Sequence, residues 1–199
     1  GTIRQLILIK RDSRQMHLHK LVTPGLASLP GDLSYLDIDF VFSGNEARKA
    51  RYRLVFCPPS LDPVAAETMH NMLGADVYGL CVSVVSFVDM IQLDRQQEQL
   101  QNAALGAEEP INVFAKPEGS FNLTLGELQY LYGTLVDLML KVADNEGIQI
   151  LFFAAEREEL MATYKRYVKR FTQERGLTYL NDGASYAIRT QHYPKQRED

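Results

Sequence analysis

Hydrophobic and polar residues alternate with a period of two in two neighbouring stretches, residues 35–42 and 51–56. Such alternation predicts strands with one covered face and one polar face. The polar turn at residues 44–49 joins the two stretches and predicts an antiparallel hairpin. Folding this hairpin would place Asp37 and Asp39 on the same face as Arg51 and Arg53, and we expect the four charges to form a solvated sheet face.

Other apolar runs predict further strands, at residues 3–9, 78–88, 111–115 and 148–153. The run 78–88 is nearly continuous and rich in valine, which is typical of a central strand covered on both faces. Near the end of the chain, Asn181-Asp182-Gly183 separates the short runs 177–180 and 186–189. This turn sequence predicts a second hairpin.

Three helices have clear boundaries in the sequence. Asp62 and Pro63 begin the first, which Gly74 ends. Thr124 and Glu127 form a capping box that begins a helix over 125–146. The third helix, 156–175, is strongly amphipathic and carries an outward basic stripe, formed by Lys165, Arg166, Lys169 and Arg170. The polar, glutamine-rich stretch 93–109 is consistent with either a fourth helix or a mobile excursion.

These elements predict an α/β (α+β) fold, in which a mixed, mostly antiparallel central sheet is flanked by about four helices. We expect one domain over residues 1–190, with a polar, glutamine-rich excursion at 94–110 and a polar tail at 191–199. A linker between two small domains is the alternative interpretation of the excursion. The strands on either side of it favour a single sheet.

Composition narrows the class of protein. The 199 residues are 46% hydrophobic and 23% charged, with a net charge of −4, as in ordinary globular proteins. The acidic balance argues against a nucleic-acid-binding protein, and no apolar run reaches the roughly 20 residues that span a membrane. The N-terminus lacks a signal-peptide pattern, and Cys57 and Cys81 lie in apolar runs that favour buried, reduced thiols. We therefore expect a cytoplasmic protein.

Few residues suggest chemistry directly. His17 and His19 would lie on one side of a strand, but no cluster of carboxylates or cysteines accompanies them, so we expect no metal site. The glycines form neither a phosphate-binding loop nor a dinucleotide fingerprint. The basic stripe is consistent with a solvated helix face or with contact to an anionic ligand or an acidic partner.

The order of elements in the second half resembles that of the GNAT-superfamily N-acetyltransferases. It runs from strand 111–115 through a loop, the capped helix 125–146, strand 148–155 and helix 156–175 to the hairpin 177–190. The hairpin at 35–56 also fits the antiparallel part of that fold. In that family, the strand before the capped helix splays from its neighbour and holds acyl-coenzyme A, and backbone amides at the start of the helix bind the pyrophosphate.

The resemblance implies specific roles for residues of this chain. Acetyl-coenzyme A would be the cofactor, and its pyrophosphate would be held by the loop residues Gly119, Ser120, Asn122 and Thr124. Tyr164 would act as general acid, and Glu118 or Asp89 as general base. The chain departs from the family because its loop offers only Gly119 and Gly126 as glycines, and because Glu156-Arg157 replaces an expected asparagine.

The leading hypothesis is therefore an acyl-coenzyme-A-dependent N-acyltransferase-like protein that transfers an acetyl group to an amine. The acceptor would be an amine-bearing small molecule or protein, and a homo-oligomer is compatible with the sequence. The alternative is a catalytically inactive protein-interaction domain of the same fold. A hydrolase or another transferase without a recognisable motif forms a third class.

Overall fold

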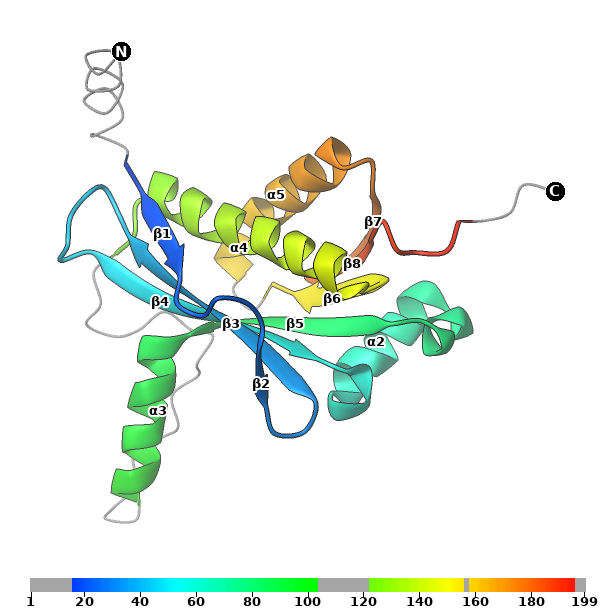
Figure 1. Ribbon diagram of the computed structural model, residues 1–199, viewed down its shortest axis with the longest axis horizontal. Helices are drawn as coiled ribbons and strands as arrows, with labels where there is room; N and C mark the ends of the chain where they lie inside the picture. The colour runs from blue at the N-terminus through cyan, green and yellow to red at the C-terminus, as the bar shows by residue number, and fades with distance from the viewer. Residues whose placement is uncertain (1–15, 104–121, 156–157, 196–199) are drawn as a thin grey trace. The chain divides into compact units, whose positions relative to one another are not determined.

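The computed structural model describes residues 16–103, 122–155 and 158–195 (Figure 1). Over these residues the fold is mixed α/β, with an eight-stranded, mostly antiparallel sheet and four α-helices. The predicted fold class is confirmed at this level. The predicted strands 3–9 and 111–115 lie outside the described residues, as do the candidate site residues Glu118, Gly119 and Ser120.

The strands are β1 (Leu18–Leu21), β2 (Ala27–Leu29), β3 (Leu33–Val41), β4 (Lys49–Cys57), β5 (Val82–Asp89), β6 (Ile150–Ala154), β7 (Thr178–Asp182) and β8 (Ser185–Arg189). The α-helices are α2 (Pro63–Leu73), α3 (Met90–Ala103), α4 (Leu125–Glu146) and α5 (Met161–Glu174). Three short 3-10 helices accompany them, at Pro59–Leu61, Ala75–Gly79 and Glu158–Leu160.

The strands follow the order β1-β3-β4-β5-β6-β8-β7, and β2 pairs with β3 beside this path. β1 and β2 are antiparallel to β3, and β8 is antiparallel to both β6 and β7. β5 and β6 are parallel, and α3 and α4 lie between them in the chain. A parallel pair needs such a crossover connection, whereas a short turn is enough to join antiparallel neighbours such as β7 and β8.

The chain divides into two compact units, and each is described on its own. The first comprises residues 1–25, 36–53 and 88–131, and the second comprises 26–35, 54–87 and 132–199. The prediction of one domain over 1–190 stays a prediction.

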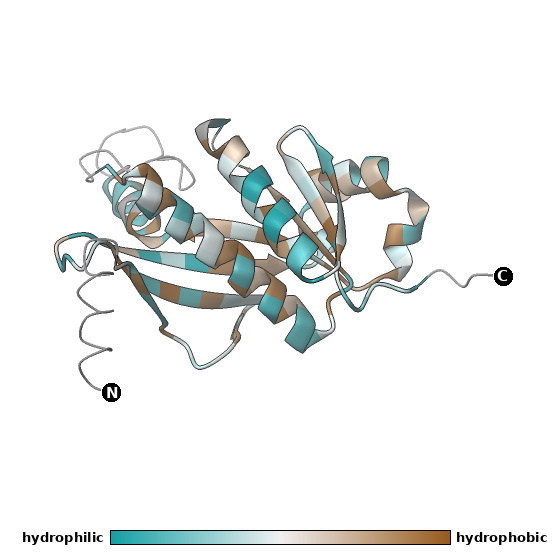
Figure 2. Ribbon diagram, turned by 90° about the horizontal axis from the view of Figure 1, so that it is seen from above, coloured by the Kyte–Doolittle hydropathy of each residue, from teal (hydrophilic) through white to brown (hydrophobic). Residues whose placement is uncertain are grey.

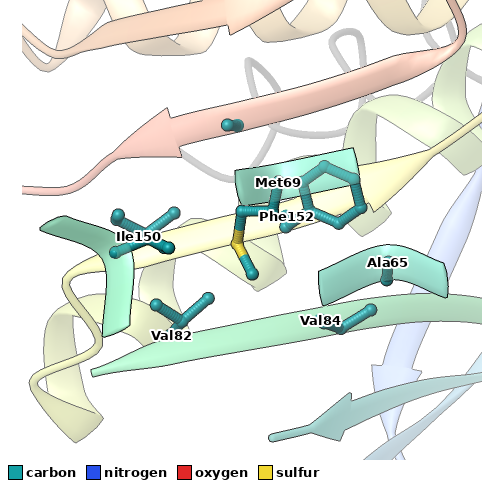
Figure 3. Close-up of a cluster of buried hydrophobic side chains, with 8 residues drawn as sticks. Ala65, Met69, Val82, Val84, Ile150 and Phe152 are labelled. Carbon is teal, nitrogen blue, oxygen red and sulfur yellow. The ribbon is translucent and has the colours of Figure 1, made fainter. Parts of the chain in front are cut away.

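In the second unit, α2 covers one face of the β5-β6-β8 part of the sheet (Figure 3). Met69 of α2 is 1% exposed and packs in a cluster with Val82, Val84, Ile150 and Phe152. The parallel register places Val82 beside Ile150 and Val84 beside Phe152, so alternate residues of both strands share this face. The N-terminus of α2 is as predicted, because the Asp62 side chain accepts a hydrogen bond from the Ala65 N–H.

Helix α5 and residues 132–146 of α4 contact the opposite face of that part of the sheet (Figure 1). Phe153, the residue after Phe152, contacts Tyr164 of α5, and Tyr164 also contacts Tyr132 of α4. The predicted basic stripe of α5 is exposed, and Figure 2 shows hydrophilic residues along this helix. The sequence placed the start of this helix too early, because Glu158–Leu160 forms a 3-10 turn before α5 begins at Met161.

In the first unit, the predicted charge pairing of the hairpin is confirmed. Arg51 Nε and Nη2 donate to the two carboxylate oxygens of Asp39 at 2.6 and 2.9 Å, and Arg53 pairs in the same way with Asp37. The expectation of a fully solvated face is wrong for Asp37, which is 7% exposed. Arg53 is itself mostly covered, so this second pair is largely desolvated.

Two other details differ from the sequence-based expectations, and one alternative that the sequence left open is decided. The stretch 10–32 shows no clear periodicity, yet it contributes β1 and β2, because pairing with β3 supplies the hydrogen bonds that these short segments need. Much of the glutamine-rich stretch is helical, as α3. Cys81 is exposed and Cys57 is half-buried, so the expectation of two buried thiols is wrong.

Among the described helices, none combines the length and the apolar character needed to cross a membrane.

Candidate functional site

The parallel strands β5 and β6 are paired over only three positions and are no longer paired beyond them. Their pairing covers only Val82 to Val84 of β5 and Ile150 to Phe152 of β6, although both strands continue past these residues. β6 remains paired with β8 as far as Ala154. Beyond Phe152, β6 therefore loses its pairing with β5 but keeps its pairing with β8, within the second unit.

Aromatic rings follow the last paired residues, Phe153 one position after Phe152 and Phe87 three positions after Val84. Phe87 of β5 and Phe153 of β6 have ring centroids 5.6 Å apart. Tyr164 of α5 stacks on Phe87 at 5.7 Å and contacts Phe153 at 5.9 Å. The candidate acid Tyr164 thus touches a residue from each of the two strands where they part, and it is 4% exposed.

The N-terminus of α4, in the first unit, carries a second group of polar side chains. The predicted capping box is present, since the Glu127 N–H donates to Thr124 Oγ1 at 3.1 Å and the Thr124 N–H donates to Glu127 Oε1 at 2.8 Å. Arg48, from the turn before β4, also binds the Glu127 carboxylate, with Nε 2.9 Å from Oε2 and Nη2 bonded to Oε1. Arg48 Nη2 donates in addition to the main-chain oxygen of Asn122 at 2.9 Å.

The Glu127 side chain is completely buried, and this environment fixes its charge. The hydrogen bond from Arg48 is the main cause that lowers the pKa of Glu127 from 4.5 to about 2, and the Thr124 N–H adds to this effect against the opposing effect of burial. The Arg48 guanidinium, in turn, has its pKa raised by Glu127. The helix terminus therefore holds a permanently ionised but charge-compensated pair.

Two histidines and a tyrosine extend this group. The predicted placement of His17 and His19 on one side of the strand is confirmed, because both rings contact the ring of Tyr130 on α4, at 5.2 and 5.6 Å. The Tyr130 hydroxyl and His19 Nδ1 are hydrogen-bonded to each other. His17 Nδ1 accepts the Ser43 N–H at 3.0 Å, and the Ser43 hydroxyl donates to Glu127 at 3.3 Å. A phenol bonded to an imidazole can exchange a proton with it.

The remaining candidate residues lie at different places in the fold, and several of them hydrogen-bond to helix N-termini or to residues beside them. Asp89 ends β5, and its carboxylate accepts the Ile91 N–H at 2.9 Å at the start of α3. Asn122 and Thr124 meet in the first unit at the α4 terminus, together with Glu127. Tyr164 belongs to the second unit. In the part of the chain that the structure describes, no group of three or more His, Cys, Asp or Glu side chains could hold a metal ion.

Sequence reasoning missed Arg48, Ser43 and Tyr130 as parts of this group. The capping box identifies Thr124 and Glu127 from their spacing alone, but Arg48 precedes Glu127 by 79 residues. The one available signal was a cation, Arg48, in the turn of the predicted hairpin. Nothing in the sequence indicates that this turn approaches a helix terminus.

Comparison of the chain with protein-family models, with curated proteins and with solved structures gave no match in any of the three.

Proposed function

We propose that the protein is an acyl-coenzyme-A-dependent N-acyltransferase that transfers an acetyl group to an amine. The observation that carries the proposal is the early separation of the parallel strands β5 and β6, with Tyr164 in contact with both strands at that point. In the family that the sequence resembles, acyl-coenzyme A lies between two such splayed strands. β5 would take the role that the sequence assigned to residues 111–115.

The connection between these strands also supports the proposal. The 22-residue helix α4 lies in the crossover from β5 to β6, and its first turn carries a capping box. The residues Thr124, Leu125 and Gly126 in this turn are exposed, and the capping box does not use the N–H groups of Leu125 and Gly126. Exposed first-turn amides suit a phosphate group.

The charge of Glu127 bears on how well this terminus fits a pyrophosphate. A buried carboxylate at the helix terminus would repel an anion, but Arg48 compensates its charge through two hydrogen bonds. The N–H groups of Leu125 and Gly126 would be donors to the pyrophosphate, whereas the Thr124 N–H is already bonded to Glu127. These residues fit a pyrophosphate bound mainly through the backbone.

The proposed roles of the side chains follow from the reaction. Attack of an amine on a thioester releases a thiolate and leaves an extra proton on the nitrogen. Tyr164 would donate a proton to the thiolate, and Glu118 or Asp89 would accept the proton from the amine. The carboxylate of Asp89 lies at the end of β5, where it accepts the Ile91 N–H at 2.9 Å.

Thermal unfolding in the presence of acetyl-coenzyme A tests the proposal. A ligand at 100 times its dissociation constant stabilises the folded state by about 2.7 kcal/mol. For a chain of this length, that corresponds to a rise in Tm of about 5–10 °C. ATP at the same concentration controls for nonspecific anion binding. A Tm that does not move with millimolar acetyl-coenzyme A rejects the proposed function.

The role of Tyr164 is tested separately by substitution. Tyr164→Phe should bind acetyl-coenzyme A as the unmodified protein does but lower kcat by about 100-fold, because only the proton donor is lost. Tyr179→Phe, in β7, is the matched control and should leave both binding and turnover unchanged. Unchanged turnover in Tyr164→Phe removes this residue from the mechanism.

The exposed basic stripe of α5 favours the alternative function, a catalytically inactive protein-interaction domain. Lys165, Arg166, Lys169 and Arg170 all face solvent on one helix. Such a surface attracts acidic partners in a salt-dependent manner. This alternative predicts no thermal shift with acetyl-coenzyme A, together with binding of a poly-glutamate peptide that weakens as salt is raised.

A further inference from the structure

A groove of about 720 Å³ lies on the first unit, along β1, β3 and β4 and the start of α3. From β1, Leu18, His19 and Lys20 all line the groove, and the side chains of Leu18 and Lys20 lie on the strand face opposite that of His17 and His19. All of its lining residues belong to the first unit. Its volume is within the range of small-molecule sites.

Aliphatic side chains form part of the lining of the groove. Leu18 of β1 is 51% exposed, although it lies directly opposite Val41 of β3 in the sheet register. Ile91 of α3 is 43% exposed and lines the same groove. Contact with an apolar ligand would remove these two large side chains from water.

The charged side chains of the groove do not balance. Its three cations are Lys20, Lys49 and Arg51, and its two carboxylates are Asp39 and Glu46. Arg51 is bound bidentately to Asp39, at 2.6 and 2.9 Å, so neither group of this pair is readily released. Lys49 pairs with Glu46 at 2.6 Å, but both side chains are more than half exposed, which makes this pair weak.

Lys20 supplies the excess positive charge. It lies opposite Asp39 in the β1–β3 register, and Arg51 already occupies both oxygens of that carboxylate. Lys20 forms no ion pair with any residue that the structure describes. Its ammonium group and the weakly paired Lys49 are therefore the groups that an incoming anion would meet.

We propose that this groove binds a small organic carboxylate with an apolar body. Its carboxylate would pair with Lys20 and Lys49, and its hydrocarbon part would contact Leu18, Val41 and Ile91. The single excess charge and the aliphatic lining favour such a monoanion over a polyphosphate, which would need more cations. The proposal concerns a second site and does not depend on the acyltransferase proposal.

Decanoate is the probe for this site, with binding measured by isothermal titration calorimetry. Decylamine has the same chain and the opposite charge, and acetate has the same charge without the chain. We expect decanoate to bind with one-to-one stoichiometry and at least tenfold more tightly than either of the other compounds. Equal binding of decanoate and decylamine, or no binding of decanoate, would overturn the proposal.

Substitutions locate the binding. Lys20→Glu and Ile91→Ser should each weaken decanoate binding about tenfold, because they remove the charge and the apolar contact respectively. Lys165→Glu on α5 and Leu61→Ser are matched controls at exposed positions in the second unit, and they should leave decanoate affinity unchanged. Circular dichroism checks that all four variants fold. If the controls weaken binding as much as the groove variants, the ligand binds elsewhere and the proposal is wrong.

The outcome is separable from that of the proposed function. Lys20→Glu should leave the thermal shift produced by acetyl-coenzyme A unchanged. Conversely, if the unmodified protein shows no thermal shift with acetyl-coenzyme A, it should still bind decanoate. A Lys20→Glu variant that loses both responses would contradict the assignment of two separate sites.

Discussion

At the scale of single residues, Glu127 combines a local and a long-range role. Its backbone N–H and its carboxylate complete the capping box with Thr124, which satisfies two donors at the start of α4. The same carboxylate is completely buried and receives two hydrogen bonds from Arg48. Removal of one partner from such a pair leaves the other with an uncompensated charge.

Glu127→Gln should therefore lower the free energy of unfolding by about 2–3 kcal/mol, somewhat below the usual cost of breaking a buried pair because Arg48 can regain water. Urea unfolding at pH 7 measures the change. Glu46→Gln is the matched control, since Glu46 forms an exposed pair with Lys49, and its loss should cost less than about 1 kcal/mol. Equal effects of the two substitutions would show that burial of Glu127 does not strengthen its pair.

Glu127 also gives the stability a defined pH dependence. Its folded-state pKa of about 2 lies below the ordinary 4.5, so the carboxylate stabilises the folded state at pH values above 4.5. This contribution is lost as the pH falls from about 5 towards 2. The free energy of unfolding should therefore decrease over this range more steeply in the unmodified protein than in Glu127→Gln. Parallel pH profiles of the two proteins would contradict the assigned pKa.

At the scale of elements, close contact between α4 and α5 depends on Gly133. A Cβ atom built on this glycine would lie 2.9 Å from Cε1 of Tyr167 and within 3.3 Å of two further ring atoms. Tyr167 is buried and stacked on Phe171, so its ring has little freedom to move aside. The glycine therefore allows the two helices to approach, which offsets the poor helix propensity of this residue.

Gly133→Ala should destabilise the protein by about 1–3 kcal/mol, because overpacking outweighs the gain in helix propensity. Gly126→Ala in the first turn of the same helix is the control. Its Cβ would meet only Thr124 Oγ1, at 4.0 Å, so stability should stay the same or rise slightly. Thermal unfolding compares the two variants. Stabilisation by Gly133→Ala would mean that the helices do not pack this closely in solution.

At the scale of the whole molecule, several elements belong to both compact units. β3 contributes residues 33–35 to one unit and 36–41 to the other, and β4, β5 and α4 are shared in the same way. Loss of structure in one part of a strand or helix weakens the hydrogen bonds of the adjoining part. We therefore expect the two units to unfold together, as the prediction of one domain requires.

Because the chain lacks tryptophan, single substitutions can report on each unit. Tyr52→Trp would report on the first unit and Tyr179→Trp on the second. In each variant, urea unfolding followed by tryptophan fluorescence should have the same midpoint as unfolding followed by circular dichroism. Separate midpoints within one variant would indicate two independently unfolding units and contradict the single-domain prediction.

Much of the element order was readable from the sequence, because it depends on local signals. Capping by Asp62 and by Thr124 with Glu127 was read correctly, as was the pairing of Asp37 and Asp39 with the arginines of the next strand. Other features were missed for a physical reason. β1 and β2 have weak strand patterns and depend on β3 for their hydrogen bonds.

In the candidate sites, too, single residues could be chosen from the sequence, but the contacts between distant segments could not. Tyr164 was chosen from a resemblance, and its contacts with Phe87 and Phe153 come from strands far apart in the sequence. The group at the α4 terminus needs Arg48, and the groove needs Leu18 and Ile91 on one surface. No periodicity or spacing relates such positions to one another.

The sequence by itself determined the helix boundaries that capping residues set, the alternation of strand faces and the outward basic stripe of α5, because each depends on residues within a few positions of one another. The tertiary structure alone decided which strands pair in parallel and where they part, which cation neutralises Glu127, and which exposed aliphatic side chains share a groove with Lys20. These features depend on contacts between distant segments, and such contacts form only when burial and strand pairing offset the entropy of ordering the chain.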